Sequence, residues 1–124
     1  MNQVEEVMRR NVEFCVPETR TSDMLYIMKK YNYDDLLVVD NLKEKHLIGV
    51  VHKETISDEA LKYAPRPFNL SAKNCMQKIP ATVFKDSTIE ECLNLMEKNH
   101  MGLLPVVDDW GLCVGVVVKQ DILV

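Results

Sequence analysis

The stretch "MGLLPVVDDWGLCVGVVVKQDILV", residues 101–124, closes the chain, and "YDDLLVVDNLKEKHLIGVVHKETIS", residues 33–57, carries nearly the same order of residue types. The likeness extends outward at a constant offset of 68 positions, which pairs Met8 with Met76. After the segment "NLKEKH" the offset becomes 66, so that Gly49 pairs with Gly115 and the first copy holds two extra residues. Turns tolerate insertions, and the chain is therefore a tandem repeat.

Each copy predicts the same order of elements. A short strand ("VEFCVPE" or "ATVFKDS") runs into a stretch with apolar residues at helical spacing. Ser87 followed by Glu90 is typical of a capping box that starts the second helix, while Thr19 or Thr21 could cap the first. Two apolar, β-rich runs then follow in each copy, and Asp109-Trp110-Gly111 predicts a turn between the second pair. These runs are Leu36–Val39 with Leu47–Val51, and Leu104–Val107 with Cys113–Val118.

The apolar runs lack polar alternation, which indicates strands covered on both faces. A single copy is too small to cover both faces of its own sheet, so we expect the two copies to bury one another. The predicted organisation is one compact module, with repeat 1 over residues 1–64, a proline-containing linker over 65–70 and repeat 2 over 71–124.

Composition excludes several classes of function. The 124-residue chain has a net charge of −4, whereas nucleic-acid binders concentrate Lys and Arg, so no nucleic-acid partner is expected. The basic pair Arg9-Arg10 is interpreted as a solvated face. No apolar run is long enough to insert into a membrane, and the N-terminus has no apolar signal-peptide core. The four cysteines form no C-x-x-C pair, which favours reduced, buried thiols and a cytoplasmic protein.

The repeated pattern resembles the tandem CBS domain pair, or Bateman module, named for cystathionine β-synthase. "HMGLLPVVD" and "GVVVKQDIL" are the most specific pieces, and the resemblance covers nearly the whole chain. It implies an α+β fold of duplicated βαββα repeats packed about a pseudo-twofold axis. It also implies dimers formed through helices, and adenosyl ligands bound in the cleft between repeats. The chain stops where the resemblance implies a closing helix, which favours a fragment of a longer protein.

The resemblance assigns the ribose of such a ligand to Asp121. A carboxylate can accept hydrogen bonds from both hydroxyls of a ribose diol, and the counterpart in repeat 1, Thr55, has no carboxylate. A role as a helix N-cap is the alternative for Asp121. The family often has Ser or Thr three residues earlier to meet a phosphate, but Val118 stands there and His52 in repeat 1. Lys119 could compensate.

The same resemblance assigns the adenine base to two segments. Ala81 and Thr82 correspond to the loop before the first strand of the repeat, and residues 101–105 to the strand along the base. Gly102 would let a ligand approach the backbone, although it could instead be a helix C-cap. The second segment consists of Met101, Gly102, Leu103, Leu104 and Pro105.

These observations predict a non-catalytic regulatory module that senses an adenosyl compound, such as AMP, ADP, ATP or S-adenosylmethionine. It would work as a homodimer and control a partner enzyme or transporter. No other cofactor is required, and His46, His52 and His100 lie too far apart in sequence to predict a metal site. The alternative is a dimerisation scaffold that binds no small molecule. It is favoured by Val118 and Thr55, which lack the groups that the family uses.

Overall fold

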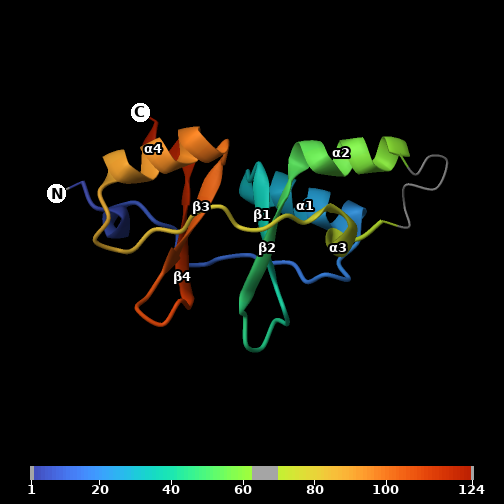
Figure 1. The fold of residues 1–124 in the computed structure, drawn as a ribbon, viewed down its shortest axis with the longest axis horizontal. Coiled ribbons are helices and arrows are strands. Elements are labelled where there is room, and N and C mark those ends of the chain that lie inside the picture. Colours follow the sequence, from blue (N-terminus) through green and yellow to red (C-terminus); the bar gives the residue numbers. More distant parts are fainter. Residues whose placement is uncertain (1, 63–69, 124) are drawn as a thin grey trace. The chain divides into compact units, whose positions relative to one another are not determined.

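The computed structural model describes residues 2–62 and 70–123, with the side chains of 59–62 left aside, so most of the predicted linker at 65–70 lies outside the described residues. The chain forms two compact units, which do not follow the sequence repeats (Figure 1). Unit 1 comprises residues 1–12 and 80–124, and unit 2 comprises residues 13–79. The first twelve residues of the chain therefore pack with the second repeat.

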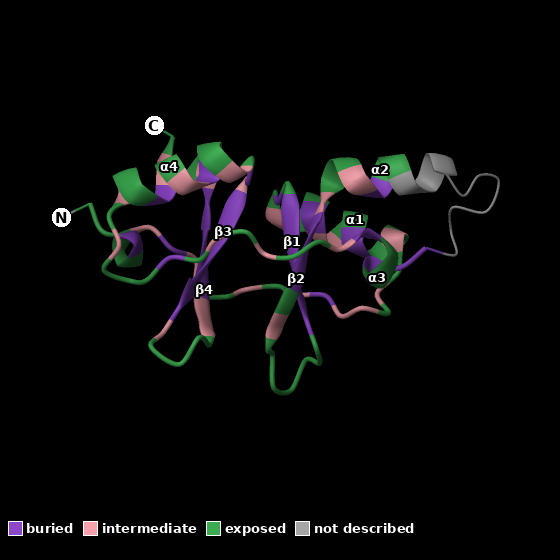
Figure 2. Cartoon of the chain, in the orientation of Figure 1, coloured by how far each residue is buried: buried purple, intermediate pink, exposed green. Residues whose placement is uncertain are grey.

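Unit 2 is built on a two-stranded antiparallel sheet. Strand β1 (Asp35–Val39) pairs with β2 (Leu47–His52), and β1 is buried along its whole length (Figure 2). Helix α1 (Thr21–Tyr31) precedes the sheet, α2 (Lys53–Lys62) follows β2 without a break, and α3 (Ala72–Cys75) completes the unit. Met24 and Met28 of α1 are buried, as helical spacing of the apolar residues predicts.

Unit 1 repeats this arrangement. Helix α4 (Ile89–Asn99) precedes the antiparallel pair β3 (Leu103–Val107) and β4 (Cys113–Val118), and the short helix α5 (Lys119–Ile122) follows. The 3-10 helix η1 (Val4–Glu6) comes from the start of the chain. The two sheets have equivalent registers, including an irregularity between Val38 and Val39 in one and between Val106 and Val107 in the other. The predicted α+β fold with a duplicated repeat is confirmed.

Each sheet has a further backbone bridge on either edge. Cys15 forms a parallel bridge to Val38, and Val83 forms the same bridge to Val106. On the opposite edges, Gln77 pairs with β2 at Val50 and Arg9 pairs with β4 at Val116. These bridges satisfy backbone groups that an edge strand would otherwise leave unpaired.

A glycine on each sheet admits the segment that crosses it. A Cβ at Gly115 would lie 2.8 Å from the Arg9 carbonyl oxygen and 3.0 Å from the Met8 sulfur. A Cβ at Gly49 would lie 3.0 Å from the Gln77 carbonyl oxygen. Real Cβ atoms essentially never lie as close as the distance at Gly115, and the distance at Gly49 is tighter than most real contacts. The close packing therefore requires glycine at position 115 and favours it at position 49.

Some local predictions were wrong. "VEFCVPE" and "ATVFKDS" contribute one bridge residue each rather than full strands. The cap of α4 is Thr88, whose hydroxyl accepts from the amide of Glu91, because the Ser87 hydroxyl accepts from Phe84 in the preceding turn. Neither Thr19 nor Thr21 caps α1: its N-cap is Arg20, and the Thr19 hydroxyl accepts from the amide of Val16.

The predicted turn at Asp109-Trp110-Gly111 is confirmed. Gly111 has a φ of 80°, a left-handed conformation that costs glycine little. The Asp108 carboxylate accepts from the amides of Trp110 and Leu112, both at 2.9 Å. The turn therefore has a side-chain acceptor as well as the backbone conformation that it requires.

Candidate functional site

Asp121 is held by a bidentate ion pair with Arg9 in unit 1. The Arg9 Nε lies 2.7 Å from Oδ2 of Asp121, and Nη2 lies 3.0 Å from Oδ1. The two side chains are 31% and 32% exposed, so the pair lies at the surface without being fully solvated. A forked guanidinium on a carboxylate fixes the carboxylate's orientation as well as its charge.

The backbone positions both members of this pair. Arg9 exchanges two hydrogen bonds with Val116, of 2.8 and 2.9 Å, which fix it on the edge of β4. Asp121 lies in the only turn of α5, whose N-cap is Val118. The N-cap alternative for Asp121 is therefore wrong, because its carboxylate binds Arg9 and α5 has no side-chain cap.

A backbone hydrogen bond joins α5 to the loop before β3. The amide of Lys119 donates to the carbonyl of Gly102 at 2.9 Å, next to the cross-strand pair of Leu103 and Val118. This contact brings the predicted ribose segment beside the predicted base segment. Gly102 is not a helix C-cap, because the C-cap of α4 is His100, whose φ is 55°.

Most side chains assigned to the base lie in the core. Leu103 is 1% exposed and Leu104 0%. Val118, at the position where the family often meets a phosphate, is 2% exposed. Met101 and Pro105 are buried as well. Such residues can contact a ligand through their backbone atoms, but their side chains are largely inaccessible to it.

Thr82 and Ala81 lie in the segment that runs beside β3. They precede Val83, whose amide donates to the carbonyl of Pro105 at 3.0 Å. Thr82 is exposed and Ala81 half-buried. The bridge places both beside β3, but no described hydrogen bond links either of them to Asp121.

Unit 2 has the same backbone frame with different side chains. The amide of Lys53 donates to the carbonyl of Asp34 at 3.0 Å, as Lys119 does to Gly102. The counterparts of Arg9 and Asp121 are Gln77 and Thr55, both uncharged. Neither member of the ion pair therefore has a charged counterpart in unit 2.

A second difference lies in the strands. The cross-strand pair equivalent to Leu103 and Val118 is Asp35 and His52. The Nδ1 of His52 is hydrogen-bonded to the carboxylate of Asp35, which is only 3% exposed. A buried polar group requires such a hydrogen-bond partner. Unit 2 therefore has a hydrogen-bonded polar pair at the position where unit 1 has two apolar side chains.

The sequence alone does not identify Arg9 or the Asp35–His52 pair. The prediction of a solvated face at Arg9-Arg10 is wrong for Arg9, which is half-buried against Asp121, whereas Arg10 is exposed. The available signal was the place of Arg9 one residue after Met8, where the other copy has Gln77 after Met76. A charged residue in one copy and a neutral residue at the equivalent position of the other copy indicate that the two copies differ in function there.

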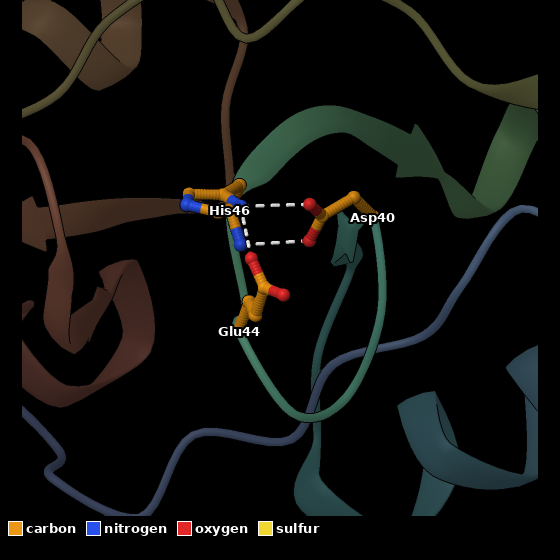
Figure 3. Close-up of side chains that lie close together, drawn as sticks. All are labelled: Asp40, Glu44 and His46. Carbon is orange, nitrogen blue, oxygen red and sulfur yellow. Dashed lines mark hydrogen bonds and ion pairs between the residues drawn. The ribbon is translucent and has the colours of Figure 1, made fainter.

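The turn between β1 and β2 gathers three possible metal ligands (Figure 3). Asp40, Glu44 and His46 lie within ligand distance of one another, and all three are exposed. The Asp40 carboxylate accepts from the backbone amide of His46 at 2.9 Å and contacts its Nδ1 at 2.7 Å. This contact raises the pKa of His46 and lowers the pKa of Asp40. The contacts of Asp40 with His46 therefore link the two ends of the turn.

The thiols are held in their neutral form. Burial raises the pKa of Cys15 to about 12 and that of Cys92 to about 11. The pKa of Cys113 is also raised, chiefly by burial. Because the thiolate is the nucleophilic form, a raised pKa makes these three thiols poor nucleophiles. Cys15 and Cys92 are core residues, and Cys113 is half-buried.

The chain belongs to the CBS domain family. The family model matches residues 4–62 and 72–124, one match for each repeat. Among the helices that the structure describes, none is both long and apolar enough to cross a membrane.

Two curated relatives place the module in longer proteins. Protein MK0525 of Methanopyrus kandleri is 28% identical over 120 residues, which cover 97% of this chain and 60% of that protein. Inosine-5'-monophosphate dehydrogenase of Methanocaldococcus jannaschii is 29% identical over 126 residues, which cover 99% of this chain and 23% of the enzyme. The chain thus spans only part of both relatives.

Solved structures share the fold at low identity. A putative acetoin utilization protein (AcuB) of Vibrio cholerae has a TM-score of 0.81 at 23% identity, covering 98% of this chain and 87% of that one. CBSX2, solved in complex with AMP, has a TM-score of 0.74 at 23% identity, covering 98% and 93%. The CBS domain pair of protein MJ0100, solved with 5'-methylthioadenosine and S-adenosyl-L-methionine, has a TM-score of 0.78 at 22% identity, covering 97% and 91%.

Proposed function

We propose that this chain is a regulatory, non-catalytic module that binds an adenosyl-containing small molecule at the face of unit 1 formed by Asp121, Lys119 and the Gly102 loop. One observation carries the proposal. Asp121 caps no helix, and its carboxylate is held in a fixed orientation and is 32% exposed. An oriented carboxylate of this kind suits a ribose diol, which needs a fixed acceptor for two hydroxyl donors.

The remaining ligand contacts are expected to come from the backbone. Gly102 and the start of β3 would approach the base, since their neighbouring side chains are buried. Ala81 and Thr82 would cover the base from the segment before Val83. The ligands bound by CBSX2 and by MJ0100 contain the same adenosyl group, which supports this choice of ligand class.

The bound ligand would act by shifting a population of arrangements, because a ligand stabilises the arrangement that it binds more tightly. We propose a partner enzyme or transporter as the regulated protein, and the dehydrogenase that contains a similar segment supports an enzyme. A homodimer is proposed as well. Helix α1 exposes Leu25 (38%) and Tyr26 (66%), which a second copy could cover.

Isothermal titration calorimetry of the wild-type chain with AMP and with S-adenosylmethionine tests this function. Asp121→Asn should weaken binding roughly tenfold to a hundredfold, since a hydrogen bond to a charged group contributes about 1.5–3 kcal/mol. Thr55→Ala, at the counterpart position in repeat 1, is the matched control and should leave the affinity unchanged. If no adenosyl compound binds, or if Asp121→Asn binds as well as the wild type, the proposal is wrong.

A ligand-free dimerisation scaffold is the second candidate. It is favoured by the same ion pair, because Arg9 already occupies both oxygens of Asp121. In that case the ion pair would only hold residues 1–12 against the rest of unit 1, which is formed by residues 80–124. Asp121→Asn would then lower the melting temperature, and no adenosyl compound would raise that of the wild type.

A further inference from the structure

The turn between β1 and β2 carries more potential ligands than its closure requires. In this turn the carboxylate of Asp40 accepts from the amide of His46 at 2.9 Å. The turn between β3 and β4 has the same bond, from the amide of Leu112 to the carboxylate of Asp108, also at 2.9 Å. Leu112 stands at the position of His46, so such a turn closes without an imidazole. The closure of the turn therefore does not explain the side chains of Glu44 and His46.

Two carboxylates converge on one ring nitrogen of His46 (Figure 3). Its Nδ1 lies 2.7 Å from Oδ2 of Asp40 and 3.8 Å from Oε2 of Glu44. A protonated His46 cancels only one of the two negative charges. Lys43 and Lys45 belong to the same turn, but among the described residues no ion pair joins either of them to the cluster. The three groups thus offer a divalent cation two negative charges and a nitrogen.

The separations between the three groups suit a metal ion. In a tetrahedral Zn²⁺ site the bonds to imidazole and carboxylate are about 2.0–2.2 Å long, so the ligand atoms lie about 3.3 Å apart. The separations of 2.7 and 3.8 Å lie on either side of this value, and all three ligand atoms are within 4.8 Å of one another. The side chains of His46 and Glu44 are 56% and 62% exposed, so they are free to make the movement of roughly 1 Å that coordination needs.

The ligand types select the class of ion. Imidazole suits zinc, copper and nickel, whereas Mg²⁺ and Ca²⁺ prefer oxygen ligands. We infer that Asp40, Glu44 and His46 form a binding site for a divalent transition-metal ion of the Zn²⁺ type. The ligands are Nδ1 of His46 and one oxygen of each carboxylate, and water takes the fourth position. The inference does not rest on the proposed function, because the cluster belongs to unit 2 and the proposed adenosyl site to unit 1.

Isothermal titration calorimetry of the whole chain with ZnCl₂ and with MgCl₂ tests the inference. One equivalent of Zn²⁺ should bind, at least about tenfold more tightly than Mg²⁺. NMR spectra recorded during the Zn²⁺ titration should show the first shifts at the amides of residues 40–46, which locates the ion.

Three variants assign the ligands. Among the described residues, the only ion pair of the Glu44 carboxylate is with His46, so Glu44→Gln removes a ligand and no hydrogen bond that closes the turn. It should weaken Zn²⁺ on the order of tenfold and leave the melting temperature without metal unchanged. His46→Leu introduces the residue of the other turn and should weaken Zn²⁺ on the order of a hundredfold. Asp108→Asn is the matched control, because it changes the equivalent carboxylate of the turn that has Leu112 instead of His46, and it should bind Zn²⁺ as the wild type does.

Four results would overturn the inference. The wild type could bind no Zn²⁺, or it could bind Mg²⁺ as tightly. His46→Leu could bind Zn²⁺ as tightly as the wild type, which would place the ion elsewhere on the chain. An equal loss in Asp108→Asn would show that acidic turns in general attract the ion. None of these results involves Asp121, so the proposed function and this metal site are tested separately.

Discussion

Gly115→Ala should separate the first twelve residues from β4. The added Cβ would lie 2.8 Å from the carbonyl oxygen of Arg9, and that oxygen accepts from the amide of Val116 at 2.9 Å. The clash is with backbone, so the methionine above it cannot relieve the contact by rotating. Either the bridge between Arg9 and Val116 lengthens or the strand bends.

The expected cost combines two destabilising effects with one effect that opposes them. Overpacking of a well-packed site costs about 1–3 kcal/mol, and weakening a backbone hydrogen bond adds about 1 kcal/mol. Replacing glycine reduces the entropy of the unfolded chain, which offsets about 0.4–1 kcal/mol. The free energy of unfolding should therefore fall by roughly 1–3 kcal/mol. Urea denaturation measures this loss, and hydrogen exchange at the Val116 amide locates it.

Two glycine controls distinguish this clash from other effects. Gly49→Ala places its Cβ 3.0 Å from the Gln77 carbonyl and should behave like Gly115→Ala with a smaller loss. At Gly111 no atom lies within 4 Å of an added Cβ, but φ is 80°, so alanine there should cost only about 1 kcal/mol of backbone strain. A Gly115→Ala protein as stable as Gly111→Ala, with unchanged exchange at Val116, would refute this account of the packing.

Three further predictions concern other parts of the chain. Asp40 raises the pKa of His46, and His46 lowers the pKa of Asp40. Their contact therefore stabilises the turn fully at pH values between the ordinary pKa of Asp and the ordinary pKa of His. This stabilisation is lost as pH rises through the folded pKa of His46, or as pH falls through the folded pKa of Asp40. An NMR titration should show the His46 pKa returning toward 6.5 in Asp40→Asn, and an unchanged pKa would contradict the contact. Cys15 and Cys92 should resist a thiol reagent at pH 8 until the protein unfolds, and rapid modification of the native protein would show that they are accessible. Thr88→Ala should lower the free energy of unfolding by about 1 kcal/mol in a urea titration, and no loss would show that the hydroxyl is not the cap.

The sequence predicts the parts of the fold that depend on local pattern. The β-rich runs and the helical spacing of the apolar residues locate the strands and the two longer helices, because burial imposes those periods. The choice between neighbouring hydroxyls is not visible in the same way. Ser87 and Thr88 both suit a cap, and only the path of the preceding turn decides that Thr88 reaches the amide of Glu91.

Pairings between distant segments leave weaker traces. Arg9 and Asp121 are 112 positions apart, and neither is part of an apolar period. The repeat shows that Gly115 has a counterpart in the other copy. It does not show why glycine is required there, because the atom that a Cβ would approach belongs to Arg9, near the other end of the chain. Sequence therefore identified Asp121 as a candidate without identifying the residue that holds it.

The crossing of the segments changes how the two copies should be compared. Along the sequence, Arg9 belongs to repeat 1 and Asp121 to repeat 2, yet they form one ion pair in unit 1. Gln77 comes from the family match of repeat 2 and serves unit 2 beside Val50. The comparison that matters is between units, each built from parts of both repeats. Residues 71–124 alone would lack Arg9 and leave the edge of β4 unpaired at Val116, so one repeat cannot form this ion pair by itself.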